Sequence, residues 1–320
     1  MQLALVNNNR VEAFFGGRGL CPTCGSEMIA KCGPRILHHW AHYRPKGCDP
    51  WWENETPWHR DWKNLFPLEC REVSHIAHDG EIHRADIKTP TGIVIEVQHS
   101  SMTDAEKTSR EEFYGNLVWV VDGSGFRQNF SIYDGLPAPT SEIAKDLIWV
   151  KARCLMKSYG ELMTRSNCAY FYRLSEARRK DPNITKAEVR SGKVRSIRSG
   201  QVHSIRLHSI REIQEQVHQS YNGYHAYSWS RPRKTWLDAQ CPVYIDFGGD
   251  CLVKLEIYDE LGLTCIRYIS KREFVHDAMV KTHASAIAPH PTRYQKTCPN
   301  NGGAADCCNS LVERLGFSNH

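Results

Sequence analysis

The sequence predicts a mixed α and β fold, in which a core with the element order α-β-β-β-α-β stands between a short Cys/His-rich module and a longer mixed region. Three observations predict this class. Apolar, β-branched runs separated by turn signals indicate strands in the middle of the chain, helical patterns stand before and after them, and residues 10–50 are rich in Gly, Cys and His.

The core elements follow one another from residue 53 to residue 121. Residues 53–66 are predicted to form a helix, and Pro57 falls in its first turn, where a missing backbone N–H costs little. Residues 104–116 have a second helical pattern, and the apolar run Leu117–Val121 predicts a buried strand after it. Between the helices, three strands are predicted at Leu68–Ser74, Glu81–Thr89 and Gly92–Gln98.

The flanking regions are less regular. Before the core, two brief strands are predicted at Glu27–Lys31 and Arg35–Trp40. After the core, the pattern is helical from about Ser141 and is interrupted by Pro182. Strand-like runs return at Val243–Phe247, Leu252–Tyr258 and Cys265–Ile269. We divide the chain into an N-terminal module (1–50), a core (51–137), a C-terminal helical and β region (138–282) and a poorly ordered tail (283–320).

Composition bounds the class of protein. The 320 residues are 41% hydrophobic, enough for a packed core, and the net charge of +5 is weak evidence for a polyanionic partner. We find no signal peptide and no apolar stretch of the roughly 18 residues that a membrane-spanning helix needs, so we expect a cytoplasmic protein without a membrane partner. In that setting the 13 cysteines indicate metal ligands and buried thiols rather than disulfides.

A zinc knuckle is predicted near the N-terminus. Cys21 and Cys24 form a C-x2-C-G pattern, in which the turn points both sulfurs inward. A structural Zn²⁺ wants four ligands, and the sequence leaves open which candidates complete the set: they are His39, His42 and Cys48, with Cys32 weaker. A redox dithiol is the alternative, but it does not explain the downstream His and Cys residues.

Two carboxylates give the strongest chemical signal. Asp86 and Glu96 stand on consecutive predicted strands joined by a tight turn, so pairing would bring both to one place. A buried charge needs a partner, and hard oxygen ligands suit Mg²⁺ or Mn²⁺. The alternative is a salt bridge to Arg84, Lys88 or Arg110. The preceding helix favours a metal site over a salt bridge, because Glu55, His59 and Lys63 recur four residues apart on one face of it.

A basic stretch follows the core. Residues 186–211 hold seven Lys or Arg, among them Lys193, Arg195 and Arg198, and only one Glu. We expect these cations to follow the backbone of a nucleic acid. A solvated helix or a linker is the alternative.

Several segments, taken in order, carry a resemblance. They are CPTCG at 21–25, HWAH at 39–42, CDPWWENETPWHRDWK at 48–63, HRADI at 83–87, VIEVQHS at 94–100 and REEFYGNLVWVVD at 110–122, with RPRKTW at 231–236 and PVYIDFG at 242–248 further on. In this order they resemble the competence protein CoiA-like family, whose nuclease core belongs to the PD-(D/E)xK superfamily. The resemblance implies a restriction-endonuclease-like core and a Mg²⁺-dependent deoxyribonuclease.

The resemblance also implies roles for the core residues. Asp86 and Glu96 would hold the catalytic metal, and Gln98 stands where the superfamily pattern usually has Lys. Because Gln carries no charge, either the metal would supply more of the electrostatic stabilisation, or Lys63 or His59 would help.

Further roles fall on the two helices. Glu55, or Glu53 before it, would add a helix carboxylate, and His59 would line the site. Arg110 and Tyr114, one turn apart, would contact phosphate or brace the core. DNA is the expected partner, with recombination or other DNA-processing proteins. The alternatives are a non-catalytic zinc-containing nucleic-acid-binding protein with a relic nuclease core, and a zinc hydrolase that uses the Cys/His cluster and Glu55.

Overall fold

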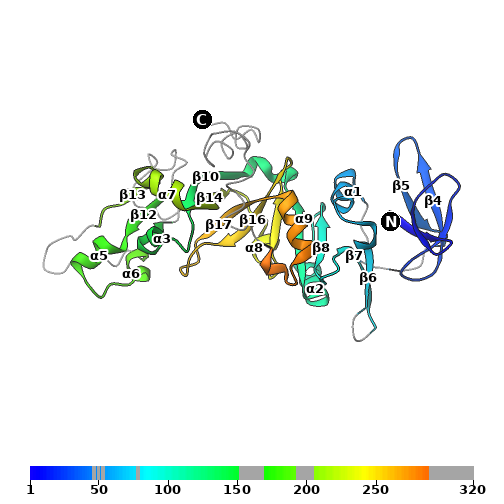
Figure 1. Ribbon diagram of the computed structural model, residues 1–320, viewed down its shortest axis with the longest axis horizontal. Coiled ribbons are helices and arrows are strands. Elements are labelled where there is room, and N and C mark those ends of the chain that lie inside the picture. The colour runs from blue at the N-terminus through cyan, green and yellow to red at the C-terminus, as the bar shows by residue number, and fades with distance from the viewer. Residues whose placement is uncertain are drawn as a thin grey trace. The chain divides into compact units, whose positions relative to one another are not determined.

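The computed structural model describes residues 1–44, 48, 51, 55–76, 80–150, 169–191 and 205–287 (Figure 1). The chain forms two compact units. Of the described residues, the first comprises those within Met1–Gly125, Arg233–Asp246 and Ser270–Ala288, and the second comprises those within Phe126–Pro232 and Phe247–Ile269. Glu53, Lys193, Arg195, Arg198 and the predicted tail beyond residue 287 lie outside the described residues. No helix in the described ranges is both long and apolar enough to cross a membrane.

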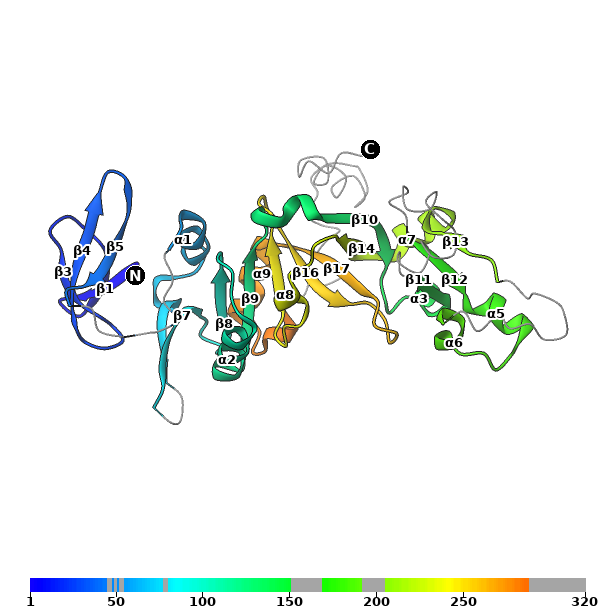
Figure 2. The same cartoon turned by 180° about the vertical axis from the view of Figure 1, so that it is seen from behind.

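The first unit begins with a five-stranded antiparallel sheet in the order β2-β1-β3-β4-β5 (Figure 2). Its strands are β1 (Leu3–Val6), β2 (Asn9–Glu12), β3 (Arg18–Leu20), β4 (Glu27–Gly33) and β5 (Ile36–His42). The two predicted strands are confirmed as β4 and β5. Met28 and Trp40 pack with Met1, Ala4 and Cys21 in a small core of their own.

The predicted order α-β-β-β-α-β is confirmed in the larger part of the first unit. The elements are α1 (Pro57–Asn64), β6 (Arg71–Ile76), β7 (Ile82–Lys88), β8 (Val94–Gln98), α2 (Asp104–Tyr114) and β9 (Leu117–Asp122). α1 starts where Thr56 accepts a hydrogen bond from the His59 N–H and Pro57 occupies the first turn. α2 starts at the Thr103 cap and stops at Gly115, whose φ of +66° suits glycine.

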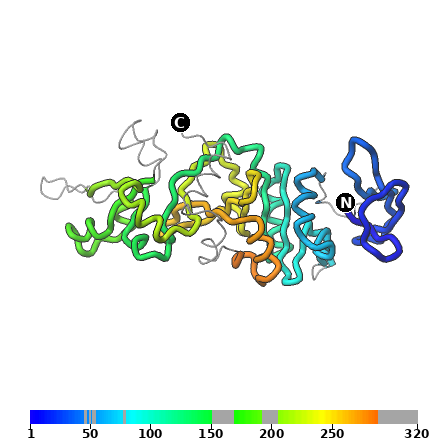
Figure 3. Tube along the Cα trace, turned by 45° about the horizontal axis from the view of Figure 1, so that its top comes forward, coloured from blue at the N-terminus to red at the C-terminus, as the bar shows by residue number. Residues whose placement is uncertain are grey.

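Strand pairing in this part is antiparallel for β6, β7 and β8 and parallel from β8 to β9. A later strand, β15 (Val243–Asp246), adds in parallel beside β9. The helices α8 (Lys234–Leu237) and α9 (Lys271–Val280) belong to the same unit, and Phe274 of α9 contacts Trp62 of α1 and Tyr244 of β15. In Figure 3 the orange trace of α9 accordingly lies beside the cyan part of the chain.

The second unit holds two sheets. The larger has the order β10-β14-β17-β16, and the smaller has the order β11-β12-β13. Their strands are β10 (Phe130–Pro137), β14 (Tyr221–Trp229), β16 (Cys251–Ile257), β17 (Thr264–Ser270), β11 (Leu147–Val150), β12 (Tyr170–Arg173) and β13 (His208–Ser209). Its described α-helices are α3 (Glu142–Asp146), α5 (Leu174–Lys180), α6 (Lys186–Arg190) and α7 (Gln214–Ser220). Short 3-10 turns complete the described chain at Leu68–Cys70, Ser124–Asn129, Ile210–Ile213 and Ala284–Ala286.

Three predicted strands in the later chain are confirmed as β15, β16 and β17, but two other expectations differ from the structure. The helical pattern expected from Ser141 is interrupted after α3, because Leu147–Val150 forms a buried strand against β12, and helices return as α5 and α6. The start of the predicted tail is packed: Ile287 is fully buried, and its carbonyl accepts a hydrogen bond of 2.6 Å from the Tyr244 hydroxyl.

A buried histidine makes the stability of the second unit depend on pH. His225 on β14 contacts the Tyr133 carbonyl through Nδ1 (2.7 Å) and the Tyr221 hydroxyl through Nε2 (2.6 Å). Burial lowers the pKa of His225 to about 4, against 6.5 for the unfolded chain. Between these two pH values the unfolded state therefore binds a proton that the folded state does not bind. The free energy of unfolding falls as the pH falls from 6.5 towards 4, by about 3 kcal/mol in total.

Urea unfolding followed between pH 7.5 and pH 4.5 tests this. Other groups titrate in the same range, so the informative quantity is the difference between the wild type and His225→Gln, which cannot take up the proton. The variant is expected to start less stable at pH 7.5, and this gap should narrow as the pH falls. Parallel pH profiles for the two proteins would contradict the role given to His225.

Candidate active site and metal centre

The core of the first unit places several ionisable or polar side chains around one cavity. α1 contributes His59 and Lys63, β7 contributes Asp86, and β8 contributes Glu96 and Gln98. The cavity has a volume of about 40 Å³. Since a water molecule needs about 10–15 Å³ measured in this way, the cavity has room for a cation with a few waters.

Asp86 and Glu96 lie next to each other because of the register of β7 and β8. Ile87 pairs with Ile95, so the residues before and after this pair are neighbours across the hairpin. The Asp86 N–H donates to Glu96 Oε1 (3.3 Å), and the Val97 N–H donates to Asp86 Oδ2 (3.0 Å). The structure thus brings the two predicted carboxylates together in one cavity.

Each of these carboxylates also has a cationic or ionisable partner. His59 Nε2 lies 2.9 Å from Asp86 Oδ1, and Arg110 Nη1 donates to Glu96 Oε2 at 3.0 Å. The salt bridge considered as an alternative therefore exists between Glu96 and Arg110. Every carboxylate oxygen has two lone pairs, so these contacts leave acceptor capacity on both groups.

Burial and charge drive the pKa values of the two carboxyl groups apart. For Asp86, burial favours the neutral form, but His59 and then Lys63 outweigh it, and its pKa is lowered. For Glu96, burial and the charge of Asp86 act together against Arg110, and its pKa is raised. The cavity without a cation therefore favours one ionised and one protonated carboxyl group, as expected where two carboxylates share a buried site.

Lys63 lies in a buried ion network. Only 2% of it is exposed, and its ammonium group contacts Glu72 Oε1 (2.8 Å) and Glu55. Glu72 of β6 also accepts the backbone N–H groups of Gln2 (2.8 Å) and Leu3 (2.9 Å). This network connects β1 to the core. The positive charge of Lys63, which the sequence analysis assigned to contact with a nucleic acid, is already balanced by Glu72 and Glu55.

Glu72 is a site residue that the sequence reasoning missed. It is 3% exposed, and its pKa is held well below the usual value because Lys63, Arg84 and the N-terminal amine outweigh the effect of burial. The sequence feature that could have indicated it is the position of Glu72, a charged residue, inside the predicted strand Leu68–Ser74. Its partners come from distant segments, which local patterns do not reveal.

The other predicted residues are placed as follows. Glu55 lines the cavity but precedes α1, which begins at Pro57, so the predicted helix carboxylate is not on the helix. Arg110 is 3% exposed and also contacts Glu106 (2.6 Å) and the Trp51 carbonyl (3.1 Å), which favours bracing over phosphate contact. Tyr114 is buried in the lining and forms edge contacts with the Trp51 ring.

Gln98 lies at the end of β8 with 2% of its surface exposed. Its Nε2 donates to the Ser100 carbonyl (3.3 Å) and hydroxyl (3.1 Å), which orients the amide in the cavity lining. The side chain can donate and accept hydrogen bonds but supplies no charge.

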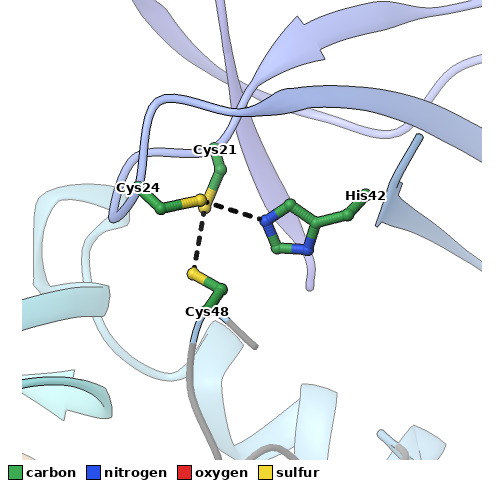
Figure 4. A group of neighbouring side chains, drawn as sticks. All are labelled: Cys21, Cys24, His42 and Cys48. Atoms are coloured by element: carbon green, nitrogen blue, oxygen red, sulfur yellow. Dashed lines mark hydrogen bonds between the residues drawn. The ribbon is translucent and has the colours of Figure 1, made fainter. Parts of the chain in front are cut away.

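A second group of side chains forms a candidate metal centre in the N-terminal sheet. The ligand atoms of Cys21, Cys24, His42 and Cys48 lie within 4.8 Å of one another (Figure 4). With Zn–S bonds of about 2.3 Å, two sulfurs on a tetrahedral ion stand roughly 3.8 Å apart. The Cys21 and Cys48 sulfurs are 3.7 Å apart, and Cys24 Sγ lies 3.3 Å from His42 Nε2. The cluster could hold a structural metal such as zinc.

The knuckle has the predicted turn. Gly25 has a φ of +69°, and its N–H donates to the Cys21 carbonyl at 2.9 Å. Of the open candidates, His42 and Cys48 complete the group. His39 does not, because it lies three residues from His42 on the extended strand β5 and so points to the opposite face. Cys32 is not part of the group in the described chain.

The thiols of this group favour a cation. For Cys24, burial opposes ionisation, but hydrogen bonds from Ser26, Cys48 and His42 outweigh it and lower its pKa to about 6. Burial and the neighbouring sulfurs of Cys24 and Cys21 raise the pKa of Cys48 to about 12. One thiolate forms readily, whereas three adjacent thiolates need a positive charge between them.

Comparison with known proteins bears on this N-terminal segment. Residues 12–50 match the family model described as Competence protein CoiA, N-terminal domain. No curated protein and no solved structure matches the chain. The matched segment contains β2–β5 and all four members of the Cys/His group. This segment is therefore similar to the N-terminal domain of the competence protein CoiA family.

Proposed function

We propose that the chain is a divalent-metal-dependent nuclease that hydrolyses phosphodiester bonds in DNA. The observation that carries the proposal is the convergence of Asp86 and Glu96, from adjacent strands, in one cavity lined by charged side chains. Their arrangement supports a PD-(D/E)xK type of core, in which the order α-β-β-β-α-β presents the two carboxylates.

The donor set suits a hard cation. Carboxylate oxygens with room for a few waters are the surroundings that Mg²⁺ and Mn²⁺ prefer. Asp86 and Glu96 would hold the ion. When bound, it would polarise the scissile phosphate and lower the pKa of a water molecule.

The remaining side chains have positioning roles. His59 holds Asp86, and Arg110 holds Glu96, so both carboxylates are oriented before a cation arrives. Gln98 would align the attacking water through hydrogen bonds. This chemistry needs no covalent intermediate.

DNA is the proposed substrate because of charge and family. The net charge of +5 favours a polyanion, and the CoiA match supports a competence-related role, which would place the enzyme in DNA uptake, recombination or foreign-DNA processing.

One observation favours a second candidate, a nucleic-acid-binding protein with a relic nuclease core. Glu55, Asp86 and Glu96 already have Lys63, His59 and Arg110 as respective partners, so much of the cavity charge is balanced without a cation. The zinc hydrolase alternative has less support, because four protein ligands leave no open coordination position on the ion.

The test is metal dependence with the wild-type protein. After gel filtration into metal-free buffer, the protein is incubated with supercoiled plasmid and with a single-stranded oligonucleotide. We expect cleavage with Mg²⁺ or Mn²⁺, and none without them or with Zn²⁺ alone. A cleavage rate that is the same with and without Mg²⁺ would reject the proposal, and binding without any cleavage would support the relic core.

A further inference from the structure

The outer side of the N-terminal sheet forms a continuous surface. In the register of β3, β4 and β5, Arg18 pairs with Ile29 and Ile29 with Ala41, while Lys31 pairs with His39. Side chains paired in this way point to the same side of a sheet. We call this side the outer face.

The opposite side of the same strands faces the small core. Met28, Ala30 and Trp40 alternate with the residues of the outer face and pack with Met1 and Cys21. The outer face is therefore not needed to cover that core.

The outer face combines an aromatic ring with positive charge. Tyr43 follows β5, donates its backbone N–H to the Glu27 carbonyl and is 51% exposed. The Arg18 guanidinium lies 5.9 Å from the centre of the Tyr43 ring. Leu20 is 47% exposed, and Lys31 is exposed on β4.

The charge balance indicates the kind of partner. Within residues 1–44 the exposed cations are Arg18, Lys31, Arg35 and Arg44, and the exposed carboxylates are Glu12 and Glu27. Among the described residues, none of these four cations has an ion pair with a carboxylate. On the outer face itself, Arg18 and Lys31 stand against one carboxylate, Glu27, which pairs with Leu20. The face therefore has a net positive charge, which a polyanion complements.

We propose that the outer face, through Tyr43, Arg18 and Lys31, binds single-stranded nucleic acid. An exposed ring beside a guanidinium offers a stacking surface for an unpaired base, and the lysine lies where the backbone would follow the sheet. A duplex keeps its base faces stacked inside, so a single strand fits this chemistry better. The proposal goes beyond cleavage and stands whether or not the chain is a nuclease.

The Cys/His group is positioned to support this face. Tyr43 directly follows His42, which belongs to that group, and Met28 pairs with His42 across the strands. A metal held there would fix the end of β5 and with it the backbone of Tyr43.

The test is fluorescence anisotropy of the full chain with a labelled 15-nucleotide single strand and with the matching duplex, without added Mg²⁺. We expect Tyr43→Ala to weaken single-strand binding about tenfold, because one base loses its stacking partner. Arg18→Ala and Lys31→Ala are each expected to reduce the slope of log K against log salt by about 0.7.

Phe15→Ala is the matched aromatic control. Phe15 is 72% exposed in the same module but contacts His38, which alternates with His39 and so lies off the outer face. It should bind as the wild type does. Metal content is measured for every variant, and Lys31→Glu is a second probe that touches no member of the Cys/His group. Wild-type-like binding by both Tyr43→Ala and Lys31→Glu would overturn the proposal, as would failure of the wild type to bind the single strand.

Discussion

Replacing Asp86 by asparagine is expected to lower the rate of Mg²⁺-dependent DNA cleavage by a factor of about a thousand or more. A bound metal supplies several kcal/mol of transition-state stabilisation, and each 1.36 kcal/mol corresponds to about tenfold in rate. Asparagine keeps the size of aspartate but removes the charge that a hard cation needs. It also removes the ionised partner of His59 Nε2, which lies 2.9 Å from Asp86 Oδ1.

The fold is expected to survive this change. Asparagine retains one oxygen that can accept the Val97 N–H, which now donates to Asp86 Oδ2. The measurement is the single-turnover cleavage rate at saturating protein, together with the thermal unfolding midpoint. Saturation separates a loss in chemistry from a loss in DNA binding.

Asp104→Asn is the matched control. Asp104 is an exposed aspartate at the start of α2 that contacts the Thr235 hydroxyl at 2.8 Å and does not line the cavity. It should cleave as fast as the wild type does. A rate for Asp86→Asn within threefold of the wild type, in a folded protein, would remove Asp86 from the proposed chemistry.

The convergence of Asp86 and Glu96 could be predicted because it is local. The two residues are ten positions apart on strands joined by a short turn, and pairing of such strands needs no information from elsewhere in the chain. The order of the core was predictable for a related reason, since apolar runs such as Leu117–Val121 show their burial in the sequence.

Non-local pairing could not be predicted in the same way. Val243–Asp246 has a visible strand pattern, but its parallel pairing with β9 bridges more than a hundred residues. β10 and β14 were not predicted as strands, and their sequences mix polar and aromatic residues without clean alternation. The Lys63 and Glu72 pair was missed because its partners come from a helix and a strand whose contact only the fold defines.

The metal ligands show how local geometry corrects a spacing argument. His39 and His42 have the same two-residue gap as Cys21 and Cys24, which suggests a second pair of ligands. On a turn, a gap of two residues lets both side chains bind one ion. Both histidines are on β5, however, and residues three apart on a strand point to opposite faces. His42 therefore joins the Cys/His group, and Cys48 supplies the remaining ligand.

Loss of one member of this group is expected to unfold the N-terminal sheet. Its buried core consists of Met1, Ala4, Cys21, Met28 and Trp40, too few residues to stabilise a module of this size by burial alone. Binding of a structural zinc ion contributes roughly 10 kcal/mol or more in small domains. His42→Ala should therefore abolish metal binding and expose β4 and β5 to rapid amide hydrogen exchange.

His39→Ala and Cys32→Ser are controls from the same two strands. Zinc content measured by atomic spectroscopy is expected to be about one ion per chain for the wild type and for both controls, because neither side chain belongs to the group. If His39→Ala lost the metal and His42→Ala kept it, the alternation of β5 would be reversed. The face that carries Tyr43 and Arg18 would then turn towards the small core, so the metal content of these two variants also tests the geometry on which the nucleic-acid surface depends.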